Sequence, residues 1–329
     1  MEACRVAQQR YKLQFDWNHV AEIFDRQQRI MASGLLLKSK TKMNRTIRAL
    51  DLDSRLTVGD IMSSPVRWVD QRAKVSAAID EMKKGRIDDA RIVYDGKEPT
   101  RTYVTLNGLE KCDRSATVEK VSSKIEKRHE ISPKHHVIDL PRKLMTNYHL
   151  GEGFLFCYEG SALQGIVTVS DLSEYAFLLA VFALLARSEE LTRLLITTHD
   201  RWWLTFKEKH LDDFSRCRRF LEEAKDENAD LPFSFYLGLD HKLNLIQDLN
   251  MGRWIPNELK DDIFREGLVK TRNGVAHPRE LLPRGSRDLP MLHEEIESLQ
   301  ELCSNILSCK KIGRQRPHEP STNAILGQS

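Results

Sequence analysis

The chain lacks the cysteine patterns of metal-binding and disulfide-stabilised proteins. None of its cysteines belongs to a Cys-x-x-Cys pair, although metal cages and disulfide frameworks need such close or patterned spacing. A chain of 329 residues also buries enough apolar surface to fold without covalent cross-links. We therefore expect free thiols in a reducing cytoplasm at all six cysteines: Cys4, Cys112, Cys157, Cys217, Cys303 and Cys309.

The sequence also has no apolar run long enough to cross a bilayer, which needs about 20 residues. Its longest apolar stretch, residues 175–186, is bounded by Glu174 and Arg187 and predicts a buried helix. The N-terminal sequence MEACRVAQQRYK contains no apolar core of a signal peptide. We expect no membrane partner and a cytoplasmic location.

A strong net charge is absent as well. The formal charge is +3, so the chain as a whole has no field that would demand a nucleic acid partner. Residues 1–56 predict a helical segment, because their apolar residues recur at roughly helical spacing, and residues 38–48 are locally basic. Such a basic run is most often a solvated helix face, and contact with phosphate groups is the alternative.

What the sequence does contain, in residues 57–174, is an internal repeat of strand, helix, strand, turn and strand. The first copy comprises a strand at 66–69, a helix at 75–84, a strand at 90–94, the turn Asp95-Gly96 and a return strand at 102–105. The second copy comprises a helix at 137–145, a strand at 154–158, the turn Glu159-Gly160 and a return strand at 165–168. Each return strand runs directly into a helix, at Leu109 and Leu172.

The end of the second copy, GIVTVSDL at residues 165–172, resembles a CBS domain, as does the opening TVGDIM at residues 57–62. The resemblance implies a tandem pair that binds an adenine nucleotide or a related ligand in a cleft between the copies. It also implies that Thr168 contacts phosphate while Asp171 holds the ribose hydroxyls, a task that suits a carboxylate. The first copy has Thr105 but Gly108 in place of the acid, so we expect at most one intact ribose site. The alternative is that Asp171 only caps the helix beginning at Leu172.

Beyond Glu174 the strand signals stop and helical patterns follow. The expected helices are 175–199, 210–228, 235–250, 257–275 and 289–307. Residues 311–329 are polar, contain Pro317 and Pro320 and show no periodicity, which predicts a disordered tail.

The sharpest local feature of this helical part is RNGVAHP at residues 272–278. Arg272 offers a permanent charge with a planar donor fork that suits phosphate, and His277 can move a proton near neutral pH. Together they suffice for attack of a ribose 2′-hydroxyl on the neighbouring phosphate, with no cofactor for catalysis. The structural alternative is that Arg272 pairs with an acid, Asn273 caps and His277 sits in the turn before Pro278.

Spacing alone is weak evidence, because Arg193 precedes His199 at a similar separation. The setting of Arg272, with Asn273 beside it, small residues after it and Pro278 ending the element, resembles the active-site motif of HEPN domains. The resemblance covers about 175–310 and implies catalytic roles for Arg272, Asn273 and His277. It implies a metal-independent endoribonuclease that leaves 2′,3′-cyclic phosphate ends and acts as a toxin or in antiviral defence.

The motif also bears on oligomeric state. Residues five apart on a regular helix differ by about 140° in direction, so Arg272 and His277 share a face only if Gly274 or Pro278 breaks the helix. Otherwise the motif meets its copy from a second chain across a two-fold axis. HEPN relatives typically build the site at such an interface, and we expect a homodimer.

Other candidates are weaker. His135 and His136 point in different directions in any regular element, and no third ligand completes a metal site. Trp202 and Trp203, which follow Arg201, could stack on bases, although packing in the core is the simpler expectation.

The sequence therefore predicts an α+β multidomain chain with four parts: an N-terminal helical segment (1–56), a CBS-type α/β pair (57–174), an all-α HEPN-like bundle (175–310) and a disordered tail (311–329). The expected function is a ribonuclease acting on RNA and regulated by a nucleotide bound to the pair, with an antitoxin protein as a further partner. The rival is a non-catalytic nucleotide-sensing regulator whose helical domain dimerises or recruits a partner. A third reading is nucleic acid binding through residues 38–48.

Overall fold

The computed structural model describes residues 56–85, 90–96, 98–148, 152–226, 232–276, 288–309, 312 and 317–327. These residues form two compact units, one of residues 56–186 with 256–302 and one of residues 187–255 with 303–327. The boundary passes within the helices α8 (Tyr175–Ile196) and α13 (Asp288–Leu307). The helix predicted in residues 1–56 and the basic segment 38–48 lie outside the described residues.

The first repeat copy forms a four-stranded sheet of order β1-β2-β3-β4, in which β1 and β2 are parallel and the other neighbours antiparallel. The first copy supplies β1 (Trp68–Asp70), α4 (Val75–Gly85), β2 (Ala90–Asp95), β3 (Glu98–Thr105) and α5 (Leu106–Glu110). The second copy opens with α6 (Val118–Val121) and β4 (Ser123–Lys124), and β4 completes this sheet. Gly96 has φ +63°, a left-handed conformation that glycine adopts without steric cost and that suits the predicted turn after Asp95.

The second copy repeats this arrangement in a three-stranded sheet of order β5-β6-β7, with β5 and β6 parallel. Its elements are η3 (Lys127–His129), β5 (Glu130–Ile131), η4 (Val137–Asp139), α7 (Leu140–Tyr148), β6 (Phe154–Glu159), β7 (Ala162–Thr168) and η5 (Val169–Ser173). The predicted repeat is confirmed. The strands β4 and β5 were not predicted, because two residues are too few for a periodic signal.

Each copy opens with a short segment that pairs with the other copy. Val58, in η2 (Val58–Asp60), donates its N–H to the carbonyl of His135 at 2.9 Å. At the equivalent place Val118 donates to the carbonyl of Ala73, also at 2.9 Å. Val58 and Val118 are both fully buried, so this exchange links the copies through their cores as well as through their backbones.

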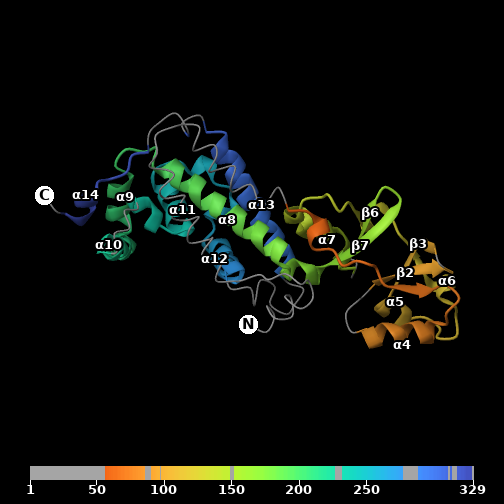
Figure 1. The fold of residues 1–329 in the computed structure, drawn as a ribbon. Helices are drawn as coiled ribbons and strands as arrows, with labels where there is room; N and C mark the ends of the chain where they lie inside the picture. The colour runs from red at the N-terminus through yellow and green to blue at the C-terminus, as the bar shows by residue number, and fades with distance from the viewer. Residues whose placement is uncertain are drawn as a thin grey trace. The chain divides into compact units, whose positions relative to one another are not determined.

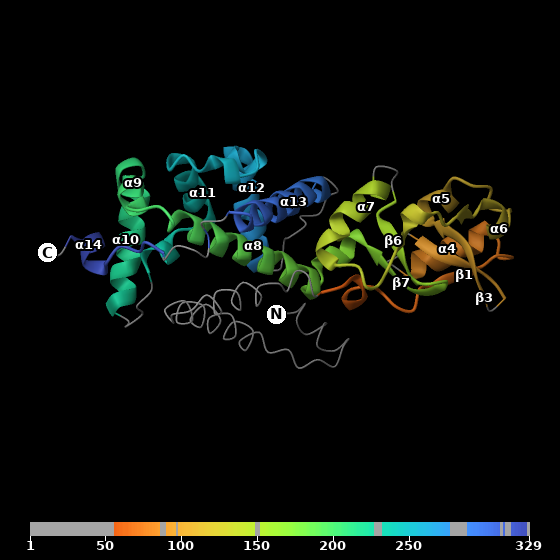
Figure 2. The ribbon, with the colours of Figure 1, turned by 90° about the horizontal axis from the view of Figure 1, so that it is seen from above.

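Two apolar clusters hold the α/β pair together. On one face of the first sheet, α4 and α5 cover the strands (Figure 1), and Ile79 and Leu109 pack there with Val93 and Val104. The other cluster joins the two sheets and contains Ala90, Ile92, Tyr103, Phe154, Phe156, Tyr158 and Ile166. In the second copy α7 lies beside β6, which Figure 2 shows from above. The copies therefore meet through apolar sheet faces.

Among the described residues after Glu174, the five predicted helices are present together with two more. The predicted helices are α8, α10 (Leu211–Asp226), α11 (Leu239–Asp248), α12 (Asp262–Ala276) and α13. Three short 3-10 helices lie between these α-helices, and some of them occupy residues that had been predicted as α-helix. They are η6 (Phe233–Tyr236), η7 (Gly252–Trp254) and η8 (Glu258–Lys260). The helices α9 (Trp202–Lys209) and α14 (Thr322–Leu326) were not predicted.

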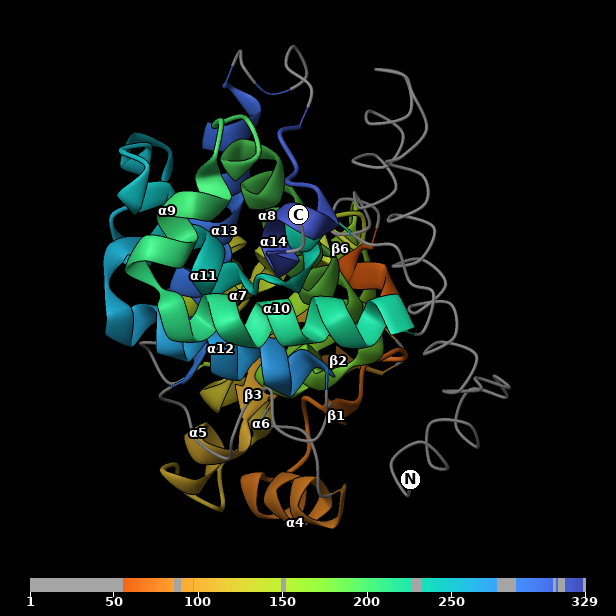
Figure 3. The ribbon, with the colours of Figure 1, turned by 90° about the vertical axis from the view of Figure 1, so that its left-hand side faces the viewer.

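Trp202 has the core position expected of it. Its side chain is fully buried, and its ring stacks on Phe233 with centroids 6.0 Å apart. Phe214 meets Phe233 edge-on at 5.3 Å. These aromatic contacts join α9, α10 and η6. Figure 3 shows α9 and α10 together with α14.

The prediction of a disordered tail differs from the structure. In the described part of that tail Ser321 caps α14 by accepting a hydrogen bond from the N–H of Ala324, and Ile325 and Leu326 are buried. Figure 3 shows α14 beside α10, and the two helices are in contact. The polar composition hid this order, because two buried aliphatic residues are enough to anchor a short helix against an existing core.

Among the described helices, none combines the length and the apolar character that a membrane span requires. None of the described cysteines forms a disulfide bond: Cys112, Cys157, Cys217, Cys303 and Cys309.

Candidate ligand-binding and catalytic sites

The predicted ribose site lies where β7 ends and η5 begins. Thr168 has an extended backbone, and both its N–H and its hydroxyl donate to Oδ2 of Asp171, at 2.6 and 3.0 Å. Asp171 therefore stabilises its own turn from position N3, with Thr168 as the N-cap residue; the turn begins at Val169 and not at Leu172, where the alternative had placed the start of a helix. Both side chains are only partly buried, so this position combines a carboxylate and a hydroxyl with access to solvent.

The negative charge of Asp171 also affects Cys157, which lies outside the turn. Burial, reinforced by the negative charge of Asp171, raises the pKa of the Cys157 thiol to about 12. Cys157 is fully buried on β6. This thiol therefore stays protonated and is not a nucleophile of the site.

The equivalent turn of the first copy also follows an extended threonine, but it opens an α-helix and lacks the acid. Thr105 accepts a hydrogen bond from the N–H of Gly108 at 3.0 Å. A Cβ on Gly108 would lie 2.9 Å from Oγ1 of Thr105, so any side chain there would displace the hydroxyl from this position. Of the two turns, only the one at Asp171 presents a carboxylate.

A close backbone contact beside the Asp171 turn was missed at the sequence level. Ser63 exchanges two backbone hydrogen bonds with Ile166 on β7, at 2.8 and 3.0 Å. A Cβ on the neighbouring Gly165 would lie 2.8 Å from both the carbonyl oxygen of Ser63 and Sδ of Met62. Glycine is therefore required at 165, and the end of the opening segment, at Met62 and Ser63, lies against the strand that ends at Thr168.

The Arg272 motif is described only in part. Helix α12 continues through Gly274 to Ala276, so this glycine does not break the helix. The backbones of Arg272 and Asn273 belong to the last turns of α12, while their side chains and the whole of His277 lie outside the described residues.

A buried carboxylate that the sequence did not single out lies next to this motif. Glu295, on α13, is 1% exposed and accepts a hydrogen bond from the hydroxyl of Thr271 at 2.5 Å. A Cβ on Gly267 would lie 3.0 Å from its other oxygen, so a glycine on α12 makes room for it. Thr271 immediately precedes Arg272, which places a buried carboxyl group next to a neighbour of the motif.

Arg193 and His199, which are six residues apart where the motif has five, have different surroundings. Arg193 is buried and pairs with Glu190 on the same helix, with the two nitrogens Nε and Nη2 at 2.8 and 2.9 Å from its carboxylate. His199 is exposed, and its Nδ1 lies 2.8 Å from the carbonyl oxygen of Asp200. Arg193 is therefore held by structural partners, as spacing without context implied.

A second unpredicted cluster lies between the two copies. His129 is 1% exposed, and its Nδ1 accepts the N–H of Glu126 at 3.0 Å, so in this neutral tautomer Nε2 donates to Glu152 at 3.0 Å. Tyr103 donates to the other oxygen of Glu152 at 2.5 Å. Burial, together with this hydrogen bond, raises the pKa of Tyr103 well above its ordinary value. One carboxylate thus joins a strand of the first copy to the opening of the second.

No set of three or more His, Cys, Asp or Glu side chains in the described ranges is arranged to hold a metal ion. His135, one of the weak metal candidates, has its Nε2 3.7 Å from Asp139. Burial lowers its pKa.

No protein-family model matches the chain, and no curated protein matches it in sequence. Solved structures that are similar over part of the chain are CBS domain proteins. One is a conserved CBS domain protein of unknown function from Thermoplasma acidophilum, with 18% identity and a TM-score of 0.31 over 39% of this chain and 75% of that one. Another is the CBS domains of a transcriptional regulator from Streptococcus pneumoniae, with 17% identity and a TM-score of 0.31 over 36% and 98%. A third is a CBS domain pair/ACT domain protein from Thermotoga maritima, with 19% identity and a TM-score of 0.29 over 36% and 93%.

Proposed function

We propose that this chain is a nucleotide-responsive regulatory protein whose α/β pair binds one adenine nucleotide at Thr168 and Asp171. The observation that carries the proposal is the asymmetry of the two equivalent turns. Both end a return strand with a threonine, and only the second presents a carboxylate, at a partly exposed position. The CBS resemblance of residues 57–174 supplies the ligand class.

The cap at Asp171 is compatible with ligand binding. A carboxylate has two oxygens with about four acceptor positions, and the cap uses Oδ2 for two hydrogen bonds. The position that the Thr168 hydroxyl occupies on Asp171 can pass to a ribose hydroxyl, while the N–H of Thr168 keeps the turn. The hydroxyl of Thr168 would turn from Asp171 to a phosphate oxygen when the ligand arrives.

Calorimetric titration with AMP, ADP and ATP tests this proposal directly. We expect one binding event per chain, lost in Asp171→Asn. Asp60→Asn is a matched control, because Asp60 caps its own turn through the N–H and hydroxyl of Thr57 at 2.7 and 2.9 Å. Binding that survives Asp171→Asn, or that Asp60→Asn removes equally, would contradict the assignment.

We further propose that the regulated activity is a metal-independent cleavage of RNA at Arg272 and His277. The specific observation in favour is that α12 runs unbroken to Ala276, so Arg272 lies in its last turns and His277 directly follows it. Residues five apart differ by about 140° on such a helix, which favours a site shared between two chains. The HEPN resemblance supplies the reaction.

In this reaction His277 takes the proton of a ribose 2′-hydroxyl, and the 2′-oxygen bonds to phosphorus. The bond to the 5′-oxygen breaks, and that oxygen leaves with a proton as a hydroxyl, which leaves a 2′,3′-cyclic phosphate. Arg272 stabilises the negative charge that builds on the phosphate oxygens. Asn273 would orient the reacting groups.

The cleavage proposal is tested with mixed RNA in the presence of a chelator, with and without nucleotide. We expect cleavage by the wild type and by His199→Ala, which removes an exposed histidine outside the motif, and none by Arg272→Ala or His277→Ala. If the RNA survives equally with the wild type and with the motif variants in the presence of every nucleotide, the proposed ribonuclease activity is refuted. The chain would then be a non-catalytic sensor, the rival reading. Regulation requires that the nucleotide prefer one packing of the chains, so Asp171→Ala should abolish its effect and leave basal cleavage.

A further inference from the structure

The described part of the C-terminal tail lies on the helical unit of residues 187–255 and forms specific hydrogen bonds with it. The N–H of His318 donates to the carbonyl of Thr197 at 2.8 Å, and the carbonyl of His318 accepts from the indole of Trp202 at 2.7 Å. Further along, the carbonyl of Leu326 accepts from Arg218 at 3.0 Å. Both backbone groups of one tail residue are therefore bound, as in the recognition of an extended peptide.

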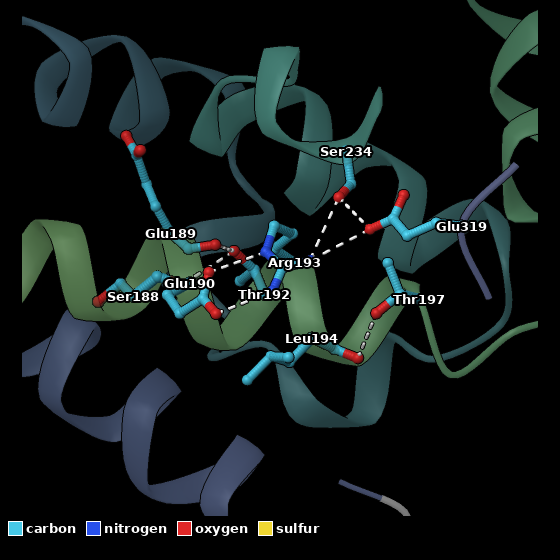
Figure 4. Close-up of polar contacts among 9 residues, drawn as sticks. All are labelled: Ser188, Glu189, Glu190, Thr192, Arg193, Leu194, Thr197, Ser234 and Glu319. Carbon is cyan, nitrogen blue, oxygen red and sulfur yellow. Dashed lines mark hydrogen bonds and ion pairs between the residues drawn. The ribbon is translucent and has the colours of Figure 1, made fainter. Parts of the chain in front are cut away.

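Between these contacts the carboxylate of Glu319 enters a polar pocket, which Figure 4 shows. Oε1 of Glu319 lies 3.2 Å from Nη1 of Arg193 and accepts a hydrogen bond from the hydroxyl of Ser234. Arg193 is 3% exposed and its guanidinium lies over the ring of Phe235 at 4.5 Å. Ser234 is fully buried. The pocket thus offers this carboxyl group two donors, one from α8 and one from η6.

The charges in this pocket do not balance. Two carboxylates, those of Glu190 and Glu319, share the single guanidinium of Arg193. Oε2 of Glu319 is buried and has no hydrogen-bond partner among the described residues. Burial accordingly raises the pKa of Glu319. The tail carboxylate fits the pocket less completely than Glu190 fits the arginine, so it is the group that can leave.

The far end of the tail is held by apolar contact. Ile325 and Leu326 are 3% and 8% exposed, while Asn323 and Ala324 of the same helix face solvent. The features that the groove recognises are therefore a carboxylate, an extended backbone beside it, and two aliphatic side chains six and seven residues further on. Pro317 and Pro320 flank the acid and favour the extended form before binding.

We propose that residues 317–327 are an intramolecular occupant of a peptide-binding groove in the helical unit. The ligand class of this groove is an acidic peptide of a partner protein with the same pattern, and its binding displaces the tail. The tail covers the groove in the absence of the partner, because tethering keeps its effective concentration in the millimolar range.

The test uses full-length chain and a fluorescent peptide of residues 317–327. The double variant Glu319→Ala/Leu326→Ala weakens docking of the tail and leaves the groove intact. We expect the peptide to bind this double variant at least tenfold tighter than the wild type. The matched control chain Asn323→Ala alters an exposed residue of α14 and should bind like the wild type.

Two further variants separate recognition of the acidic side chain from apolar contact. A peptide with alanine in place of the acid should bind the double variant more weakly. Adding Ser234→Ala to the double variant removes a pocket donor and should weaken binding as well, whereas Ser215→Ala, at an exposed site on α10, should not. A folded double variant that fails to bind the peptide overturns the proposal, as does wild type that binds it equally well.

Should the double variant fail to fold, the wild-type chain provides the test. In a ¹⁵N-labelled chain the amide of His318 is protected by Thr197. Excess unlabelled peptide should accelerate its hydrogen exchange by displacing the tail. Unchanged exchange at millimolar peptide would overturn the proposal.

Discussion

The two Thr-x-x-Asp turns of the α/β pair allow a sharp test of nucleotide binding. Asp171 and Asp60 each accept two hydrogen bonds from the threonine three residues earlier, with nearly equal distances. Replacing either with alanine removes a cap, which typically costs about 1 kcal/mol. Both turns adjoin the backbone pairing of Ser63 with Ile166, so loss of either cap should loosen the same edge of β7.

The two variants should differ in how far nucleotide binding stabilises them. A ligand that binds only the folded state at a hundred times its Kd adds about 2.7 kcal/mol of stability. In the wild type and in Asp60→Ala this should slow opening of the second sheet about a hundredfold, since each 1.4 kcal/mol is a factor of ten. Asp171→Ala should show no such slowing when nucleotide is added. Without ligand, both Asp171→Ala and Asp60→Ala should open about fivefold more often than the wild type.

Native-state hydrogen exchange at the amide of Ile166 measures this opening, because that amide donates to Ser63. The comparison needs three chains, each with and without saturating nucleotide. A nucleotide response that is equal in Asp171→Ala and Asp60→Ala would refute the ribose role of Asp171. A response lost in both would show that the caps matter only for folding.

Three further outcomes are expected. Equal amounts of Arg272→Ala and His277→Ala chains, inactive alone, should recover about a quarter of wild-type cleavage when mixed, since half of the dimers would carry one intact composite site; no recovery would place both residues of a site on one chain. Tyr103→Phe should lower the free energy of unfolding of the α/β pair by about 2 kcal/mol, because it removes a hydrogen bond to the charged, largely buried Glu152, and an unchanged urea transition would contradict this. Tail docking should strengthen as the pH falls from 7.5 to 5: the docked pKa of Glu319 is raised above its ordinary 4.5, so docking is fully favoured below 4.5 and weakens as the pH rises through the docked pKa. Exchange at the amide next to it, corrected for intrinsic rates, measures this, and Glu319→Gln should show no such trend.

Local patterns in the sequence predicted much of the α/β pair. The turns Asp95-Gly96 and Glu159-Gly160 were identified because a glycine after an acid ends a strand, and both glycines have φ +63°. The helix at α4 and the strands β2 and β6 follow from periodicity over six or more residues. The missing acid at Gly108 was also visible, since it is a matter of residue identity.

The parts that the sequence did not reveal depend on contacts between distant residues. Tyr103 and His129 meet Glu152 across 49 and 23 positions, and no local pattern connects them. The order in the tail depends on a carboxylate at 319 that reaches Arg193, 126 positions away. The polar composition of the tail suggested disorder, because composition does not show whether a distant part of the fold binds these residues.

For the candidate sites the division is similar. Chemistry and spacing alone directed attention to Arg272, His277, Thr168 and Asp171, because the identity of a side chain limits what it can donate, accept or charge. The tertiary structure decided that Asp171 caps its turn and that α12 runs through Gly274. Residue types determine the possible chemistry of this protein, and only long-range packing determines which groups are buried together and in what state of charge.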